Sequence, residues 1–108
     1  MATRRKRSHT WLDGRSRFLH RAVAERIRED PSLISIALEN LDRWERSQGP
    51  QPAFSDWRRL LETQPLERIL ELLEEDSEEA NRLRQSSPFA GILSQEERAE
   101  LMRRYEAQ

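Results

Sequence analysis

The residue types that carry most enzyme chemistry are scarce in this sequence. Its 108 residues include two histidines and no cysteine, which excludes thiolate catalysis, disulfides and cysteine-ligated metals. His9 and His20 are eleven residues apart, whereas a metal-binding pair on one helix face needs three or four. The three glycines, Gly14, Gly49 and Gly91, are scattered and form no phosphate-binding loop. We therefore expect no catalytic residue, no bound metal and no cofactor.

A run of carboxylates between residues 74 and 79 is the remaining candidate for a cation site. The run lacks the glycine and the ligand spacing of a calcium-binding loop. A solvated acidic surface is the simpler interpretation of this segment.

Charge is segregated along the chain, although 19 basic and 20 acidic residues leave a net charge of −1. Residues 1–28 hold nine basic and two acidic groups, a balance of +7. Residues 67–81 hold one basic and seven acidic groups, a balance of −6. Such asymmetry predicts either neutralisation within the fold or docking to charged partners.

The sequence predicts an all-α fold, a small bundle of five to six short helices. β-branched residues are rare, and apolar residues recur at helical spacing wherever their pattern is regular. Residues 11–108 are expected to form one helical domain. Residues 1–10 lack apolar periodicity and are expected to be a disordered, mobile basic tail that carries Arg4, Arg5, Lys6 and Arg7.

Capping residues and prolines predict where the helices begin and end. The expected helices run from Asp13 to about Glu29, from Pro31 to about Ser47, from Ser55 to Glu62, from Pro65 onward, from the Asp76–Glu79 pair to about Gln85, and from the Ser94–Glu97 capping box toward the end of the chain.

The first expected helix carries a basic face opposite its apolar stripe. Arg17, Arg21 and Arg28 share this face, here named the basic ridge, and His20 lies at its edge. The ridge and the acidic fourth helix are interpreted as two solvated faces that attract each other, and contact with nucleic-acid phosphates or with a protein partner are the alternatives. Arg26 falls near the centre of the apolar stripe, so its guanidinium must reach the rim or pair with a carboxylate.

The segment from Arg82 to Ser94 has the most distinctive pattern in the sequence. Pro88 is expected to end the fifth helix, after which Phe89 and its apolar neighbours form a plug on an irregular loop. The plug either closes the open end of the bundle or inserts into another protein. Trp11, which precedes the first expected helix, is a second candidate anchor because aromatic and arginine side chains dominate protein interfaces.

These residues resemble a group of small helical bacterial proteins that belong to toxin–antitoxin-like gene pairs. The resemblance covers residues 13–105 and is carried by Arg15-Ser16-x-x-Leu19-His20-Arg21, Asp30-Pro31-x-Leu33, Asn40-Leu41-x-x-Trp44, Arg82-Leu83-Arg84-Gln85-Ser86-Ser87-Pro88-Phe89-Ala90-Gly91 and Glu97-Arg98. It implies an antitoxin-type role, in which a small folded protein binds and silences a toxin and also touches operator DNA. It transfers no catalytic residue.

The sequence thus predicts a non-enzymatic protein-binding module, an antitoxin-like inhibitor of a partner toxin. The expected partner-binding residues are Trp11, Arg17, His20, Arg21, Arg84, Gln85 and Phe89. One alternative is a nucleic-acid-binding protein that uses Arg4, Arg5, Lys6 and Arg7 with the basic ridge, and another is a structural subunit of a larger assembly. No apolar run approaches the ~18 residues of a membrane span, so a cytoplasmic protein without membrane contact is expected. A thin core makes a homodimer a further expectation.

Overall fold

Helix α1 is the element on which the other helices are assembled. A computed structural model describes residues 9–108, and α1 spans His9–Glu29. Leu19, Val23 and Ile27 follow one another at four-residue spacing, so their side chains share one face of the helix, and all three are buried. This face packs against the hydrophobic core.

The other described elements are also helical. A 3₁₀ turn, η1 (Pro31–Leu33), opens on Pro31 with Asp30 as its cap and leads into the following helix. The remaining helices are α2 (Ile34–Gln48), α3 (Pro52–Thr63), α4 (Leu66–Glu74), α5 (Glu78–Arg84) and α6 (Gln95–Glu106). The predicted all-α bundle is confirmed.

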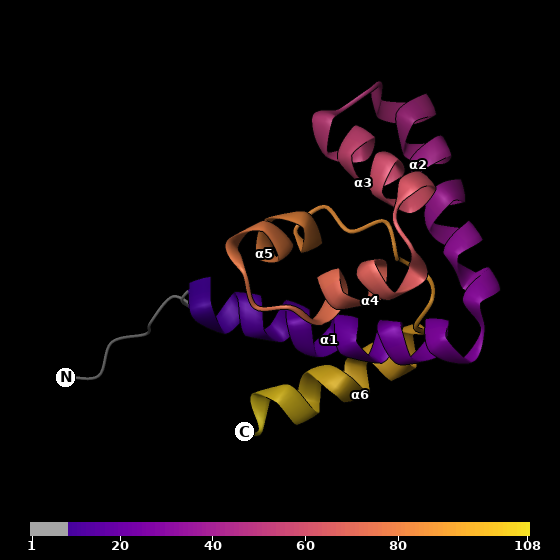
Figure 1. The fold of residues 1–108 in the computed structure, drawn as a ribbon. Helices are drawn as coiled ribbons and strands as arrows, with labels where there is room; N and C mark the ends of the chain where they lie inside the picture. Colours follow the sequence, from indigo (N-terminus) through magenta and orange to yellow (C-terminus); the bar gives the residue numbers. More distant parts are fainter. Residues whose placement is uncertain (1–8) are drawn as a thin grey trace.

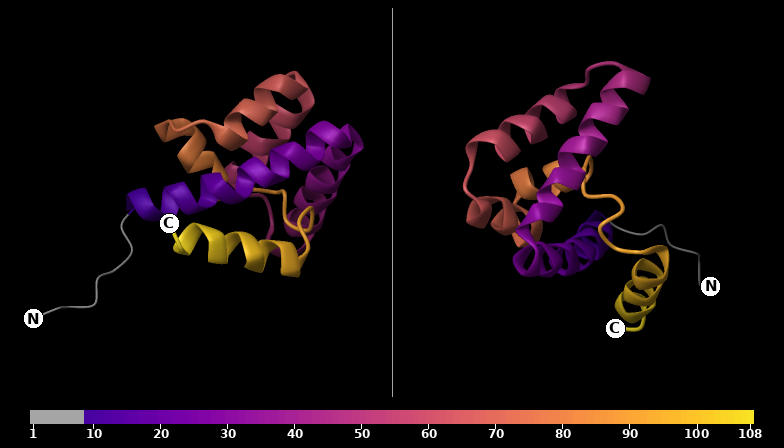
Figure 2. Two further views of the ribbon diagram at one scale, coloured as in Figure 1. Left: turned by 90° about the horizontal axis from the view of Figure 1, so that it is seen from below. Right: turned by 90° about the vertical axis from the view of Figure 1, so that its right-hand side faces the viewer.

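The helices are arranged around α1 on two sides (Figure 1). Helices α4 and α5 lie against one side of α1, and α6 lies against the other. Helices α2 and α3 form a hairpin that rises from the end of α1 where the chain turns through η1. The two further views show that α6 stands at the outside of the bundle (Figure 2).

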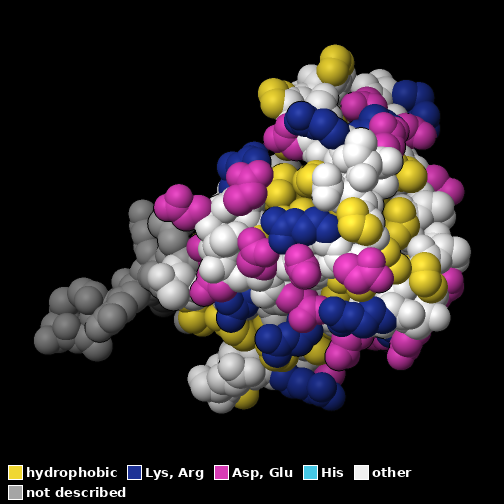
Figure 3. Space-filling view, in the orientation of Figure 1, with side chains coloured by type: hydrophobic (Ala, Val, Ile, Leu, Met, Phe, Trp, Pro, Cys, Tyr) yellow, Lys and Arg dark blue, Asp and Glu magenta, His cyan; other side chains and the backbone are white. Residues whose placement is uncertain are grey.

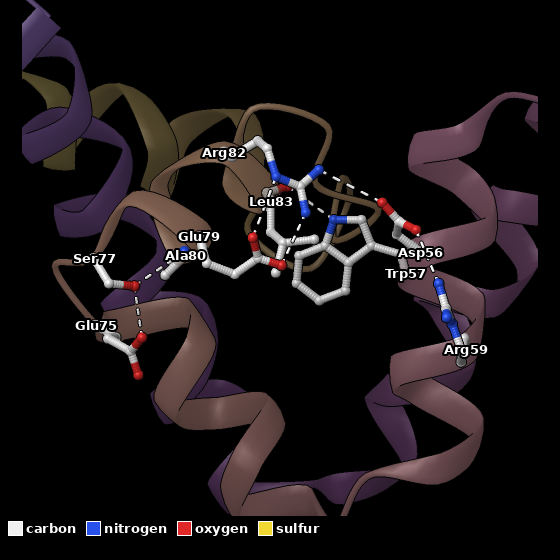
Figure 4. Close-up of polar contacts among 9 residues, drawn as sticks. All are labelled: Asp56, Trp57, Arg59, Glu75, Ser77, Glu79, Ala80, Arg82 and Leu83. Atoms are coloured by element: carbon white, nitrogen blue, oxygen red, sulfur yellow. Dashed lines mark hydrogen bonds and ion pairs between the residues drawn. The ribbon is translucent and has the colours of Figure 1, made fainter.

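The core is centred on Trp57 of α3, whose side chain is fully buried. Its indole nitrogen donates a hydrogen bond of 2.8 Å to the carbonyl oxygen of Leu83 in α5 (Figure 4). Its ring also meets the ring of Phe89 edge-on, with 5.4 Å between the centroids. An ion-pair chain from Arg59 through Asp56 and Arg82 to Glu79 covers this contact and joins α3 to α5.

The first helix begins earlier than predicted, because contacts far away in sequence support it. The edge of the Trp11 ring packs on the ring of Tyr105 in α6, and the Tyr105 hydroxyl donates to the Trp11 carbonyl oxygen at 2.9 Å. Asp13 therefore lies inside the helix and does not cap it. His9 and Thr10, predicted to belong to the tail, are helical. The rest of that predicted tail, with its four basic residues, lies outside the described residues.

Two other helix starts differ from the prediction. Ser77, not Asp76, caps α5, because its hydroxyl accepts the backbone N–H of Ala80 at 3.1 Å. Helix α3 begins at Pro52 instead of Ser55, since proline suits the first helical turn. The capping box of Ser94 and Glu97 at α6 is confirmed, with both reciprocal hydrogen bonds present.

Helix α6 contacts α1 through side chains near its two ends. None of its residues is buried, and a hollow of about 460 Å³ separates part of α6 from α1. Arg26 of α1, with a side chain 40% exposed, pairs with Glu97 of α6, so it both reaches the rim and finds a carboxylate. The ring contacts of Tyr105 hold the other end of α6.

None of the helices in residues 9–108 is long and apolar enough to cross a membrane.

Candidate functional site

A pocket of about 600 Å³ lies between α1, residues 85–93 and the first turn of α6. We name it the basic pocket. Arg15 and His20 line it from α1, Arg84 from α5 and Arg98 from α6. Between these polar groups the wall is apolar, with Leu12, Leu19, Val23, Phe89 and Leu93. Its volume lies in the range of ligand-binding pockets, and eight of its fifteen lining residues are polar or charged.

The basic pocket has no acidic lining residue among those that the structure describes. Arg98 is exposed and forms no ion pair with any carboxylate of residues 9–108. The guanidinium of Arg15 lies over the Trp11 ring, 5.5 Å from its centroid, and likewise pairs with no described carboxylate. The positive charge in the pocket is therefore available to a ligand.

Arg84 adds a buried charge behind the pocket. The residue is 3% exposed; its Nη1 donates to the carbonyl oxygen of Leu72 at 2.7 Å, and its Nη2 donates to Asn81 Oδ1. Its Nε is buried without a hydrogen-bond partner among the described residues. Burial, and then the nearby charge of Arg17, lower the pKa of Arg84. A buried guanidinium without a paired carboxylate is costly for a fold to keep.

His20 is neutral at physiological pH in this setting. Its Nδ1 lies 2.7 Å from the Ser16 carbonyl oxygen, which can only accept, so Nδ1 carries the hydrogen. Burial lowers the pKa of His20 to about 4; the hydrogen bond to Ser16 opposes this shift, whereas repulsion from Arg84 and Arg98 adds to it. The Ser16 hydroxyl is 3.3 Å from the same Nδ1, which cannot accept its proton while bonded to the carbonyl. Ser16 and His20 thus do not form a nucleophile–base pair.

The segment of residues 85–93 is positioned by a buried amide of α2. Asn40 Nδ2 donates to the carbonyl oxygens of Pro88 at 2.8 Å and of Ala90 at 2.9 Å, and Arg43 donates to Asn40 Oδ1 at 2.6 Å. Gly91 has a φ of +93°, in the left-handed region that favours glycine. The apolar plug of this segment closes the bundle, since Phe89 is buried against the core.

The structure brings four of the seven predicted partner-binding residues into this pocket: His20, Arg84, Gln85 and Phe89. Trp11 lies beside the pocket through its contact with Arg15.

Two predicted residues lie elsewhere on α1. Arg17 pairs with Asp76 at 3.1 Å, and Arg21 is exposed and does not line the pocket. The basic ridge is partly neutralised, because Arg28 also pairs with Glu74 at 2.8 Å. Basic and acidic side chains are interspersed over the face in Figure 3. The expected attraction between the two charged faces is therefore present, and Arg21 is the member of the ridge that pairs with no carboxylate of the described residues.

Sequence reasoning missed Arg15 and Arg98 as pocket residues and Asn40 as the residue that positions its wall. All three stand in the sequence motifs quoted above, but those motifs assigned no role to them. Helical periodicity alone does not distinguish them from ordinary surface or stripe positions.

The described residues contain no group of three or more histidine, aspartate or glutamate side chains placed to hold a metal ion. No protein-family model matches the chain, no curated protein matches its sequence, and no solved structure matches its fold.

Proposed function

We propose that this protein is a non-enzymatic protein-binding module and that the basic pocket and its rim contact the partner. The observation that carries the proposal is the meeting of Arg15, Arg84 and Arg98 around one pocket that no described carboxylate lines. These arginines come from three helices, so the fold itself assembles the positive charge.

The make-up of the rim supports a protein partner. Arginine and aromatic side chains supply most of the strong anchors at protein interfaces, and Trp11 stacks beside Arg15 at this rim. Unpaired positive charge speeds encounter with a negatively charged partner and selects against a positively charged one. The Nδ1 of His20 donates to the Ser16 carbonyl oxygen, so it offers no base to the neighbouring Ser16 hydroxyl.

The partner that the sequence resemblance suggests is a toxin, which this protein would neutralise by covering its working surface. Such inhibition needs steric coverage and a few strong anchors, and the basic pocket offers these anchors. A role as a subunit of an assembly uses the same surface and differs in leaving the partner active.

The test is capture of the partner by the tagged protein from a lysate of its own cells, at low and high salt. Two variants are compared with the unchanged chain. Arg15→Glu with Arg98→Glu reverses charge at the pocket, and Arg46→Glu reverses charge at an exposed arginine of α2 that forms no ion pair with described residues.

We expect one stoichiometric protein that the Arg46 variant retains and the pocket variant loses. Its activity is then assayed with and without this chain, and a fall on addition supports the toxin proposal. Equal retention by both variants contradicts the proposed surface. Recovery of nucleic acid alone, with a steep loss on raising salt, contradicts the proposed function and favours phosphate binding.

A further inference from the structure

We propose that the basic pocket is a carboxylate site, which takes a single carboxylate group of the partner between Arg15 and Arg98, with the charge of Arg84 behind it. The inference rests on the proposed function and names the chemical group that the pocket recognises. It distinguishes a specific site from a general attraction between charged surfaces.

The first support is the unbalanced charge of Arg84. Its two terminal nitrogens are satisfied by neutral oxygens of Leu72 and Asn81, and its Nε has no hydrogen-bond partner within residues 9–108. Asp13, Glu75 and Asp76 act on it only from a distance. An anion in the pocket would place a negative charge close to Arg84, which no described carboxylate does. The space is partly desolvated, so ion pairing there is stronger than in water.

The second support is the geometry of the rim. Arg15 on α1 and Arg98 on α6 line the same pocket from separate helices. A guanidinium presents paired N–H donors that match the two oxygens of a carboxylate. Neutral donors accompany them, since Ser87 and Gln95 also line the pocket.

A carboxylate fits this pocket better than a phosphate group does. Phosphate sites commonly use the free N–H groups and the positive end of a helix N-terminus. Here two N–H groups at the N-terminus of α6 are engaged, because the Ser94 hydroxyl accepts the N–H of Glu97 at 3.0 Å and the Glu97 carboxylate accepts the N–H of Ser94 at 2.9 Å.

The experiment is an NMR titration of the full chain, labelled with ¹⁵N, at about 0.15 M salt, where surface attractions are screened. The probe is an acetylated, amidated hexaglutamate peptide. Hexaglutamine of the same form is the neutral control, and inorganic phosphate tests the competing anion. Arg15→Gln, Arg98→Gln and the matched Arg46→Gln report which arginines take part.

We expect saturable binding of hexaglutamate, with shifts confined to α1, residues 85–93 and the start of α6. Losing one charge-assisted contact should weaken it about tenfold for Arg15→Gln and for Arg98→Gln, whereas Arg46→Gln should change it less than about twofold. Bound carboxylate should also raise the pKa of His20, because its negative charge would offset the repulsion from Arg84 and Arg98 that lowers this pKa; Arg15 lines the same pocket. The His20 ring signals measure this, with His9→Gln removing the other histidine.

Shifts spread over all basic surface residues, equal weakening by the Arg46 variant, an unmoved His20, or tighter binding of phosphate would each overturn the inference. A peptide that binds here while no protein is captured leaves the carboxylate site standing and contradicts the proposed function. A captured protein that ignores Arg15 and Arg98 contradicts the inference alone.

Discussion

The side-chain amide nitrogen of Asn40 lies 2.8 Å from the carbonyl oxygen of Pro88, 48 residues further along the chain. The same nitrogen also donates to Ala90, so one buried amide of α2 satisfies two carbonyl groups of the segment that walls the basic pocket. Buried carbonyl groups without helical partners need such donors, because leaving them unpaired is expensive. Asn40 therefore contributes both to the stability of the bundle and to the shape of the basic pocket.

Replacing this amide should destabilise the protein and loosen the pocket wall together. Asn40→Ala removes both hydrogen bonds and should lower the free energy of unfolding by about 2–3 kcal/mol. Glu39→Ala, at the exposed neighbouring position, should change it by less than about 0.5 kcal/mol. Urea unfolding measures both, and a loss for Asn40→Ala no larger than the control would contradict this role.

Gly14 and Tyr105 should be energetically coupled. A Cβ at position 14 would overlap with the Tyr105 hydroxyl, whereas the next ring atom, Cζ, lies 3.5 Å away. Gly14→Ala should therefore be neutral or destabilising alone, since the ring must move and the hydroxyl loses its bond to Trp11. In a Tyr105→Phe background the same change should stabilise α1 by about 0.5–1 kcal/mol, the usual gain for alanine in a helix.

A double-mutant cycle on unfolding free energies measures this coupling, which we expect to be about 1 kcal/mol. Identical effects of Gly14→Ala in the two backgrounds would show that α6 does not pack on α1 as described.

His20 should make the protein less stable in acid. Its pKa is about 4 in the folded protein against 6.5 in a free side chain, so the unfolded chain binds the proton more readily. The contribution of the neutral ring to the free energy of unfolding is fully present above pH 6.5 and is lost as the pH falls toward 4. The groups that repel its proton are Arg84 and Arg98, and Arg15 lines the same space.

His20→Gln should flatten the pH dependence of the unfolding free energy between pH 6.5 and 4. His9→Gln is the matched control and should keep the slope of the unchanged chain. Carboxylates titrate in the same range, so the difference between the two variants carries the result. Parallel curves would mean that His20 titrates normally.

Helix α6 should open without unfolding of the rest. It has no buried residue, whereas α4 buries Ile69, Leu70, Leu72 and Leu73. Amide protons of α6 should exchange with solvent at least about tenfold faster than those of α4 by local opening. Hydrogen exchange followed by NMR checks this, and equal protection of the two helices would contradict it. Because Arg98 is on α6, such opening would also widen the basic pocket.

The helices were predictable because their signals are local. The capping box of Ser94 and Glu97 contains its own partners within four residues, so its geometry follows from the sequence. The start of α1 was not predictable in this way. It depends on the contact of Trp11 with Tyr105, which no short-range pattern encodes.

Single residues of the basic pocket were predictable from the sequence, but the way in which they come together was not. A histidine without a second ligand at metal-binding spacing and an arginine next to an apolar loop mark His20 and Arg84 as candidates. Their meeting depends on the path of residues 85–93, which Asn40 sets from α2. A single asparagine between the buried Ala37 and Leu41 is a weak signal of that role. The apolar pattern of α2 does not show which groups the Asn40 amide would bind.

The central place of α1 bears on how the chain folds as it is synthesised. Helix α1 is synthesised before three helices that pack on it, α4, α5 and α6. Val23 and Ile27 therefore stay exposed on a nascent amphipathic helix until these later helices have been translated. Exposed apolar side chains on an unfinished chain promote aggregation, so α1 is the part of this fold that is most at risk until its partner helices have been made.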